Sequence, residues 1–175
     1  MNNMTGFFSL NPELFKVVSI YDDAAARERA MQVCDHLVSL LWEDAELKFH
    51  WWRTHFLRDA GLARMAAQNA VEADFVILSS NNSSMVSEEL EAWFESWIDL
   101  RNTKDGALVN LVASPGPGTE STYREDYLRE ISQRAKLDLL TVINDGNQTF
   151  VDVSVAQSRP LSQIFSSHTH FGLNE

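Results

Sequence analysis

Residues 74–80 read Asp-Phe-Val-Ile-Leu-Ser-Ser (DFVILSS), and this stretch decides the fold. Its four central residues are apolar without a break. A strand that is covered on both faces shows such a continuous run, whereas a strand with one wet face alternates apolar and polar residues. The stretch therefore predicts a central strand in a sheet that helices cover on both sides.

Strand-like and helix-like segments alternate along most of the chain. Further strands are predicted at 16–21 (KVVSIY), 46–52 (ELKFHWW), 106–113 (GALVNLVA) and 137–143 (LDLLTVI). Helices are predicted at 24–42, 60–73, 87–100 and 119–136, from apolar residues spaced by three and four. This alternation favours right-handed crossovers between parallel strands. We expect an α/β three-layer sandwich with a mostly parallel five-stranded sheet.

The length of 175 residues suits one domain. The pattern divides the chain into an N-terminal arm at 1–15, the α/β domain at 16–144 and a C-terminal extension at 145–175. Within the extension, 149–155 (TFVDVSV) alternates apolar and polar residues and could add an edge strand.

Charge and composition limit the kinds of binding partner and the cellular compartment that we expect. The net charge of −11 disfavours binding to nucleic acid and to anionic membranes. No apolar run reaches the roughly 18 residues that a membrane helix needs. The single cysteine, Cys34, allows no internal disulfide, and no signal-peptide pattern opens the chain. We expect a cytoplasmic protein.

The order of elements resembles response-regulator receiver domains and their flavodoxin-like relatives, which implies the strand order 2-1-3-4-5. Asp22-Asp23 ends the first strand, where receivers keep magnesium-binding carboxylates, and Ser114 ends the fourth, where they keep Ser or Thr. However, Ser79-Ser80 stands where the phosphate-accepting Asp belongs, and Ile143-Asn144 where a Lys belongs. The resemblance implies a receiver-like module that cannot be phosphorylated.

A second resemblance links the chain to a group of small uncharacterised bacterial α/β proteins, over roughly half of its length. The shared residues are Trp52-Arg53, Leu57-Arg58, Ala66-Ala67, Ala70, Ala73-Asp74, Ser79 and Trp93. This resemblance supports the fold and implies no activity.

In an open parallel sheet, ligands bind beyond the carboxyl ends of the strands, near the switch in strand order. The candidate ligand-binding residues at this rim are Asp22, Asp23, Ser79, Ser80, Asn81, Ser114, Gly116, Gly118 and Asn144. Their hydroxyls, amides and backbone N–H groups could hold a small polar ligand. Polar loops that merely face solvent and cap helices are the default alternative.

The adjacent carboxylates of Asp22 and Asp23 could bind a divalent cation, but no third ligand is evident, and a helix N-cap explains them more simply. No metal site is predicted. The loop 114–118 (SPGPG) could hold a phosphate at a helix start, yet no Lys follows Gly118. The turn 21–26 (YDDAAA) lacks the glycine of a flavin phosphate loop. No cofactor is predicted, and FMN is left open.

The five tryptophans, at positions 42, 51, 52, 93 and 97, exceed what one small core easily absorbs. Because tryptophan is enriched at interfaces, we expect a homodimer through a tryptophan-bearing surface, with a further protein partner left open. Cys34 lies in a predicted helix and is expected to be a buried, inert thiol.

No catalytic residue is predicted, because neither Ser79 nor Ser80 has a base placed beside it by the pattern. The preferred hypothesis is a non-catalytic regulatory or binding module of receiver-like fold. The alternative is a small enzyme or carrier that binds a nucleotide-like or phosphorylated metabolite at the strand ends. A structural subunit of a larger complex is a third reading.

Overall fold

The computed structural model describes residues 13–41, 43, 45–82, 84–101, 105–113, 123–144 and 151–153. These residues form a sheet in the order β2-β1-β3-β4-β5-β6. The strands are β1 (Glu13–Tyr21), β2 (Ala45–Arg53), β3 (Phe75–Ser80), β4 (Ala107–Ala113), β5 (Asp138–Asn144) and β6 (Val151–Val153). The first five are parallel, and β6 pairs antiparallel with β5. The predicted fold and the order 2-1-3-4-5 are confirmed, with a short edge strand added.

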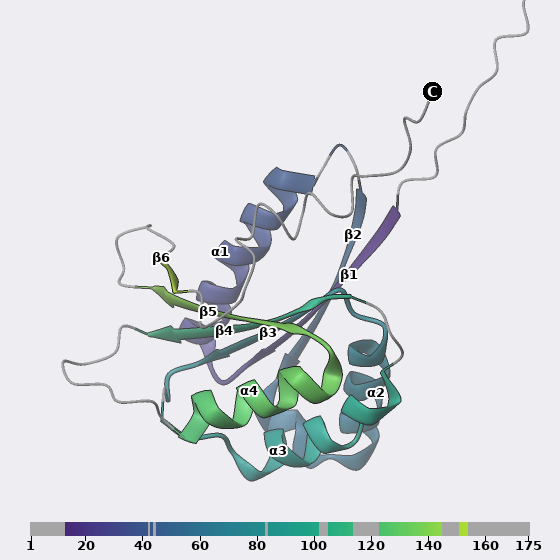
Figure 1. The fold of residues 1–175 in the computed structure, drawn as a ribbon, viewed down its shortest axis with the longest axis vertical. Helices are drawn as coiled ribbons and strands as arrows, with labels where there is room; N and C mark the ends of the chain where they lie inside the picture. The colour runs from purple at the N-terminus through teal and green to yellow at the C-terminus, as the bar shows by residue number, and fades with distance from the viewer. Residues whose placement is uncertain are drawn as a thin grey trace, which may run out of the picture.

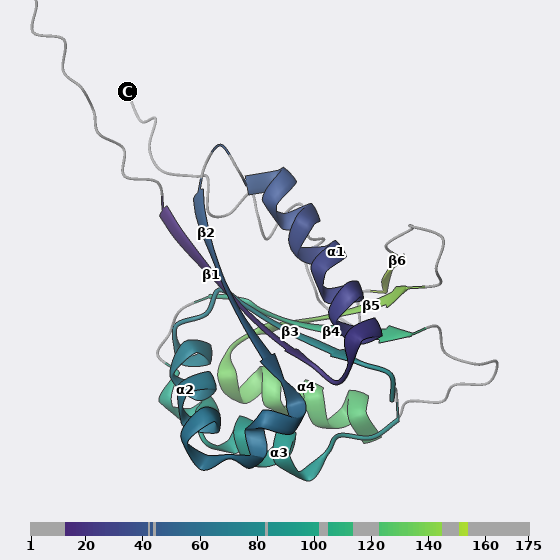
Figure 2. The ribbon, with the colours of Figure 1, turned by 180° about the vertical axis from the view of Figure 1, so that it is seen from behind.

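Helices cover both faces of the sheet. The α-helices are α1 (Ala24–Leu41), α2 (Ala60–Val71), α3 (Glu88–Glu95) and α4 (Tyr123–Ala135), and short 3-10 helices are η1 (Thr54–Arg58) and η2 (Ile98–Leu100). Among them, α1 lies on one face, and α2, α3 and α4 lie on the other (Figure 1). The view from behind shows the same three layers (Figure 2). No helix in the described ranges is both long and apolar enough to cross a bilayer.

Most boundaries differ from the prediction by at most two residues, and two larger differences are at the start of β1 and the end of α3. The first strand begins at Glu13, so Phe15 is a core residue whose ring lies 5.0 Å from that of Phe75, centre to centre. The helix predicted to reach residue 100 ends at Glu95. There the Ser96 hydroxyl donates to the carbonyl of Trp93 at 2.6 Å, and the chain continues as the tighter η2. Serine often competes with the helix backbone in this way.

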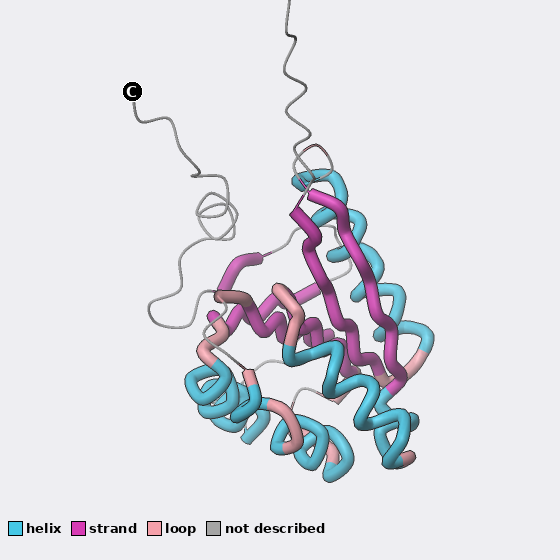
Figure 3. The backbone as a smooth tube through the Cα atoms, turned by 90° about the vertical axis from the view of Figure 1, so that its right-hand side faces the viewer, coloured by secondary structure: helices cyan, strands magenta, loops and turns pink. Residues whose placement is uncertain are grey.

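Each face of the sheet has its own apolar core. All six residues of β3 are buried, and their side chains alternate between the two cores. The core beneath α2, α3 and α4 takes Val76 and Leu78, whereas the core beneath α1 takes Phe75 and Ile77. Figure 3 shows the strands in magenta between the helices, which are cyan. This double burial is what the continuous apolar run of β3 predicts.

The tryptophans divide between the core and the half-exposed surface. Trp93 and Trp97 are completely buried beneath α3, with their rings 5.2 Å apart, so they are not available to a partner. Trp51 and Trp52 are half-buried, and Trp42 lies outside the described residues. The small alanine side chains of α2 leave room for these large rings in the core. The sequence-based prediction underestimated how many tryptophans this core can hold. A dimer through Trp51 and Trp52 stays a prediction.

Cys34 is buried against the α1 face of the sheet. Burial, followed by the nearby Asp35 carboxylate, raises the pKa of its thiol to about 12. The thiol is therefore protonated at neutral pH and weakly reactive, as expected.

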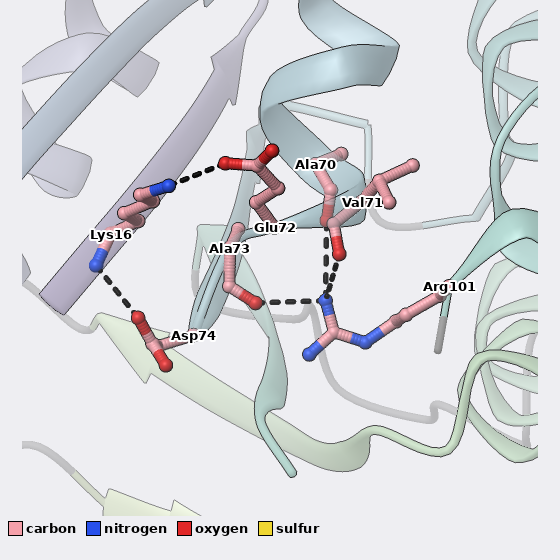
Figure 4. A network of polar contacts seen from close by, with 7 residues as sticks. All are labelled: Lys16, Ala70, Val71, Glu72, Ala73, Asp74 and Arg101. Carbon is pink, nitrogen blue, oxygen red and sulfur yellow. Dashed lines mark hydrogen bonds and ion pairs between the residues drawn. The ribbon is translucent and has the colours of Figure 1, made fainter. Parts of the chain in front are cut away.

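Asp74, which comes just before β3, joins β3 to β1 and to the start of β4; its contact with Lys16 of β1 is drawn in Figure 4. The Lys16 backbone N–H donates to the Asp74 carboxylate at 2.7 Å, and the Asp74 N–H donates back to the Lys16 carbonyl at 2.8 Å. The Ala107 N–H donates to the Asp74 carbonyl at 2.9 Å. The Lys16 ammonium pairs with Glu72. These contacts set the relative register of β1, β3 and β4.

A buried guanidinium closes the same end of the fold. Arg101 donates through Nη1 to the carbonyls of Ala73 at 2.8 Å and Ala70 at 3.2 Å (Figure 4). These carbonyls lie at and just beyond the C-terminal end of α2, where a cation complements the helix dipole. The Ala70 carbonyl also accepts the backbone N–H groups of Glu72 and Ala73. Burial lowers the pKa of Arg101, while the carboxylates of Asp74 and Asp105 oppose that shift.

Gly106 lies where no side chain fits. A Cβ atom there would come within 2.6 Å of both Arg101 Nη2 and the Asp74 carbonyl oxygen. We expect Gly106→Ala to lower the free energy of unfolding by about 1–3 kcal/mol, because the buried clamp must move. Urea unfolding followed by circular dichroism measures the loss.

The matched control is Gly61→Ala, in the first turn of α2. A Cβ atom there would meet only the Asp59 side chain, at 3.2 Å. Alanine also favours the helix by up to about 1 kcal/mol. We expect no loss of stability in this variant. Equal stabilities of the two variants would contradict the steric argument.

Candidate functional site

The ends of β2, β1 and β3 meet at one edge of the sheet. In the parallel register, Tyr21 pairs with Arg53 on one side and with Ser79 on the other. The chain leaves β1 for the outer strand β2 and returns to β3, so this edge is the switch in strand order. The next residues, Asp22, Thr54 and Ser80, therefore come together as their strands end.

Asp22 is the centre of this group. Its Oδ1 accepts a hydrogen bond from Thr54 Oγ1 at 2.8 Å, and its Oδ2 accepts one from the Ser80 hydroxyl. Its backbone carbonyl accepts a bond from Arg53 Nε at 3.1 Å. One carboxylate thus ties three strand ends together. The predicted neighbours Asp22 and Ser80 are in direct contact.

Asp23 has a different role from its neighbour. Its Oδ1 accepts the Ala26 backbone N–H at 2.9 Å, which is the N-cap of α1 that the sequence indicates. The Ala26 N–H is the main cause that lowers the pKa of Asp23, with help from Asn81. Asn81 donates to Asp23 and accepts from Arg29 Nη2 at 2.7 Å. Asp23 and Asn81 therefore serve the start of α1.

The two serines of β3 face opposite sides of the sheet, because side chains alternate along a strand. Ser79 follows Ile77 toward α1, and its Oγ is buried and has no hydrogen-bond partner. Ser80 follows Leu78 toward the layer of α2, α3 and α4 and joins Asp22. Of the two predicted serines, only Ser80 belongs to the group around Asp22.

The remaining predicted residues fall at or beyond the edge of the described chain. Ser114, Gly116 and Gly118 lie outside the described residues. Asn144 ends β5, but its side chain is also outside the described part. Their predicted role in binding stays a prediction.

Arg124 is a site residue that sequence reasoning missed. It lies in the first turn of α4 and is only 1% exposed. Its Nε donates to Asn110 Oδ1 at 3.0 Å and its Nη1 to the Met85 carbonyl at 3.4 Å. Its Nη2 is buried and has no hydrogen-bond partner. Burial lowers the pKa of Arg124 to about 10, opposed by the Asp22 carboxylate, so the side chain is charged at neutral pH.

A weak signal in the sequence pointed to this residue. Asn110 interrupts the apolar strand 106–113 (GALVNLVA), and a buried amide requires a polar partner. The identity of that partner was not readable, because Arg124 lies in a segment, 123–126 (YRED), whose composition is that of a solvated helix start.

We call Asp22, Thr54, Ser80, Asn110 and Arg124 the strand-end cluster. It combines a carboxylate, a guanidinium with a free donor, two hydroxyls and an amide. Asp22 and Arg124 influence each other electrostatically without forming an ion pair with each other.

In the part of the chain that the structure describes, the serine of the cluster has no strong general base beside it. The Ser80 hydroxyl donates to a carboxylate, which is a weak base for a serine. Within the described ranges, no imidazole is hydrogen-bonded to Ser80 or to Ser79. The arrangement can hold a ligand through hydroxyls and through the free edge of the guanidinium.

Comparisons with known proteins identify the fold. No protein-family model and no curated protein sequence matches the chain. Among solved structures, it is similar to an NADH:FMN oxidoreductase (EMOB) in its apo form, with a TM-score of 0.51 and 14% sequence identity. The likeness covers 73% of this chain and 72% of that one. At this identity it shows a flavodoxin-like α/β fold, and it lends no support to membership of the receiver family.

The lowered pKa of Asp23 makes its contribution to stability depend on pH. A carboxyl group whose pKa falls on folding stabilises the fold above its usual pKa of 3.8, and this contribution disappears as the pH falls through the lowered value. We expect Asp23→Ala to lower the Tm at pH 7. The difference from the wild type should shrink once the pH falls below about 3.8. Differential scanning fluorimetry across this range measures the effect.

Glu28→Ala, an exposed change on α1 that removes the same charge, is the control for Asp23→Ala. It should alter the Tm little at any pH. A Tm difference for Asp23→Ala that stays constant down to acid pH would contradict the assigned role of the ionised cap.

Proposed function

We propose that this chain is a non-catalytic binding module of flavodoxin-like fold, and that the strand-end cluster binds a small ligand with an anionic group. The observation that carries the proposal is the free Nη2 of Arg124, which is buried and charged while Nε and Nη1 are hydrogen-bonded. A buried donor without a partner costs about 1–3 kcal/mol, and more when it is charged. An acceptor on a ligand would recover that energy.

The surrounding charges favour a ligand of low negative charge. Asp22 lies within electrostatic reach of Arg124, and Asp23 lies beside it at the start of α1. These carboxylates oppose a multiply charged phosphate, whereas a single carboxylate group suits the planar guanidinium. Ser80 and Thr54 are oriented by Asp22 and offer hydroxyl oxygens to a neutral polar part of the ligand.

The module that we propose is not a phosphorylation switch. Phosphoryl transfer to a receiver requires an acceptor carboxylate at the end of β3, and Ser79 and Ser80 occupy that place. If the module is regulatory, the signal that we propose is ligand binding and not phosphorylation.

A flavin-dependent oxidoreductase is the second candidate function, favoured by the similarity to the NADH:FMN oxidoreductase. The residues of the turn after β1 do not fit the phosphate of FMN. The turn contains no glycine, and the Asp23 carboxylate already accepts the Ala26 N–H at the start of α1, where a phosphate would need a free donor. This is why binding of a smaller ligand is preferred.

The binding proposal is tested with a panel of probes: acetate, pyruvate, benzoate, inorganic phosphate, AMP and FMN. We expect a monocarboxylate to raise the Tm of the wild type more than phosphate does. Arg124→Met should weaken binding of that probe by tenfold or more, because a hydrogen bond to a charged group contributes about 1.5–3 kcal/mol. Isothermal titration calorimetry measures the affinity.

Arg129→Gln is the matched control for Arg124→Met, because Arg129 is exposed on the same helix and pairs with Asp126. It should bind like the wild type. If Arg124→Met fails to fold, Asp22→Asn provides a second variant. It weakens the hydrogen bonds through which the Asp22 carboxylate orients the hydroxyls of Thr54 and Ser80. Unchanged affinity in the folded variants, or a panel without any shift, would refute the site.

For the second candidate, the wild type is mixed with FMN and passed through a desalting column. We expect no flavin absorbance in the protein fraction, because the turn at Asp22 and Asp23 repels the phosphate. If flavin stays with the protein and the protein oxidises NADH, the binding-module proposal is wrong and the oxidoreductase function is supported.

A further inference from the structure

A groove separates α2 from α3, away from the strand-end cluster. It has a volume of about 430 Å³, and none of its lining residues belongs to the cluster. The apolar part of its lining includes Leu57, Ala63, Ala67, Val71, Trp93 and Trp97. Alanines four residues apart on α2 thus oppose two tryptophans of the α3 segment. Their small side chains leave the space unfilled, and the volume lies within the roughly 300–1,000 Å³ of small-molecule sites.

The apolar lining of the groove extends to Leu100, in the segment after α3. Leu100, which lines it, is 65% exposed. Its polar rim consists of Arg64, Gln68 and Ser96. An apolar floor with a few polar groups at the rim is the usual build of a ligand site.

Arg64 differs from every other arginine in the described part of the chain. It is exposed and has no hydrogen bond, ion pair or ring contact. The other arginines each contact an acceptor or a ring; they are Arg27, Arg29, Arg53, Arg58, Arg101, Arg124, Arg129 and Arg134. In a chain with 25 acidic residues, a free guanidinium at the rim of an apolar groove is unusual.

Three of the four acidic residues of α3 have other partners, and the fourth, Glu88, makes no ion pair with Arg64. Glu91 accepts a hydrogen bond from the Tyr123 hydroxyl at 2.8 Å. Glu89 is bound to Arg58, with 3.2 Å between Oε1 and Nη2. Glu95 is bound to Arg134, with 2.8 Å between Oε1 and Nη1. The cation at the rim therefore stays available to an anion from outside.

From this combination we propose that the α2–α3 groove binds a small amphipathic carboxylate. Its aliphatic or aromatic body lies against the partly exposed Val71 and the exposed Leu100, above the buried rings of Trp93 and Trp97, and its carboxylate pairs with Arg64. Gln68 and Ser96 supply neutral hydrogen-bonding groups beside that pair. Burial of the apolar body provides most of the affinity, and Arg64 selects the sign of the head group.

Octanoate is the probe for this site, and octylamine, with the same chain and the opposite charge, is its counterpart. Titration calorimetry and tryptophan fluorescence follow the binding to the full chain. We expect saturable binding of octanoate, with a change in tryptophan emission, and weaker binding of octylamine. Arg64→Gln should weaken octanoate binding about threefold to fivefold, as expected for an exposed ion pair, and should remove the preference over octylamine.

Lys48→Gln is the matched control, because it removes the same charge from an exposed position on β2, outside the groove. It should leave the affinity for octanoate unchanged. Ala63→Leu fills the groove and should abolish binding in a protein that circular dichroism shows to be folded. If Ala63→Leu does not fold, the comparison of octanoate affinities between Arg64→Gln and Lys48→Gln still tests the proposal.

Several outcomes would overturn the proposal. They are the lack of saturable octanoate binding, equal affinities of octanoate and octylamine, equal weakening by Arg64→Gln and Lys48→Gln, and full affinity in folded Ala63→Leu.

Discussion

Complete burial of β3 is the constraint on which the other features depend. Its backbone must be paired along both edges, which β1 and β4 do, and its side chains must be covered on both faces, which α1 and the layer of α2, α3 and α4 do. The helices that cover the sheet also connect its strands, so the neighbours β1 and β4 run parallel to β3. The register ends β1 and β3 at the same edge of the sheet, and this brings Asp22 beside Ser80.

Three arginines show how contacts, rather than residue type, decide a role in this molecule. Arg101 is buried against the carbonyls that end α2 and secures the amino ends of the strands. Arg124 is equally buried, but one of its nitrogen atoms has no partner. Arg64 is exposed and makes no polar contact beside an apolar groove. The first is structural, and the free guanidinium nitrogens of the other two are the basis of the two binding proposals.

The flavodoxin-like fold locates a site without naming its ligand. The edge at the switch in strand order is available in all such sheets, and the residues placed there decide what binds. Here the turn after β1 carries two carboxylates, one of which caps α1 while the other orders two hydroxyls. This turn does not suit a phosphate group, although the fold resembles that of an enzyme whose name includes FMN.

The sequence by itself determined the α/β class and the parallel sheet and placed Asp22 and Ser80 at one edge of it, because apolar periodicity reports burial and parallel strands end together. The strand order came from the resemblance to flavodoxin-like domains. It also indicated the cap at Asp23, which is local to one turn. Only the tertiary structure decided that Arg124 meets Asn110, that Ser79 turns away from the cluster, and that Trp93 and Trp97 fill the core. It also decided that alanines of α2 leave a groove beside Arg64. These contacts join residues of different elements, and their side-chain directions depend on helix packing, which no local pattern encodes.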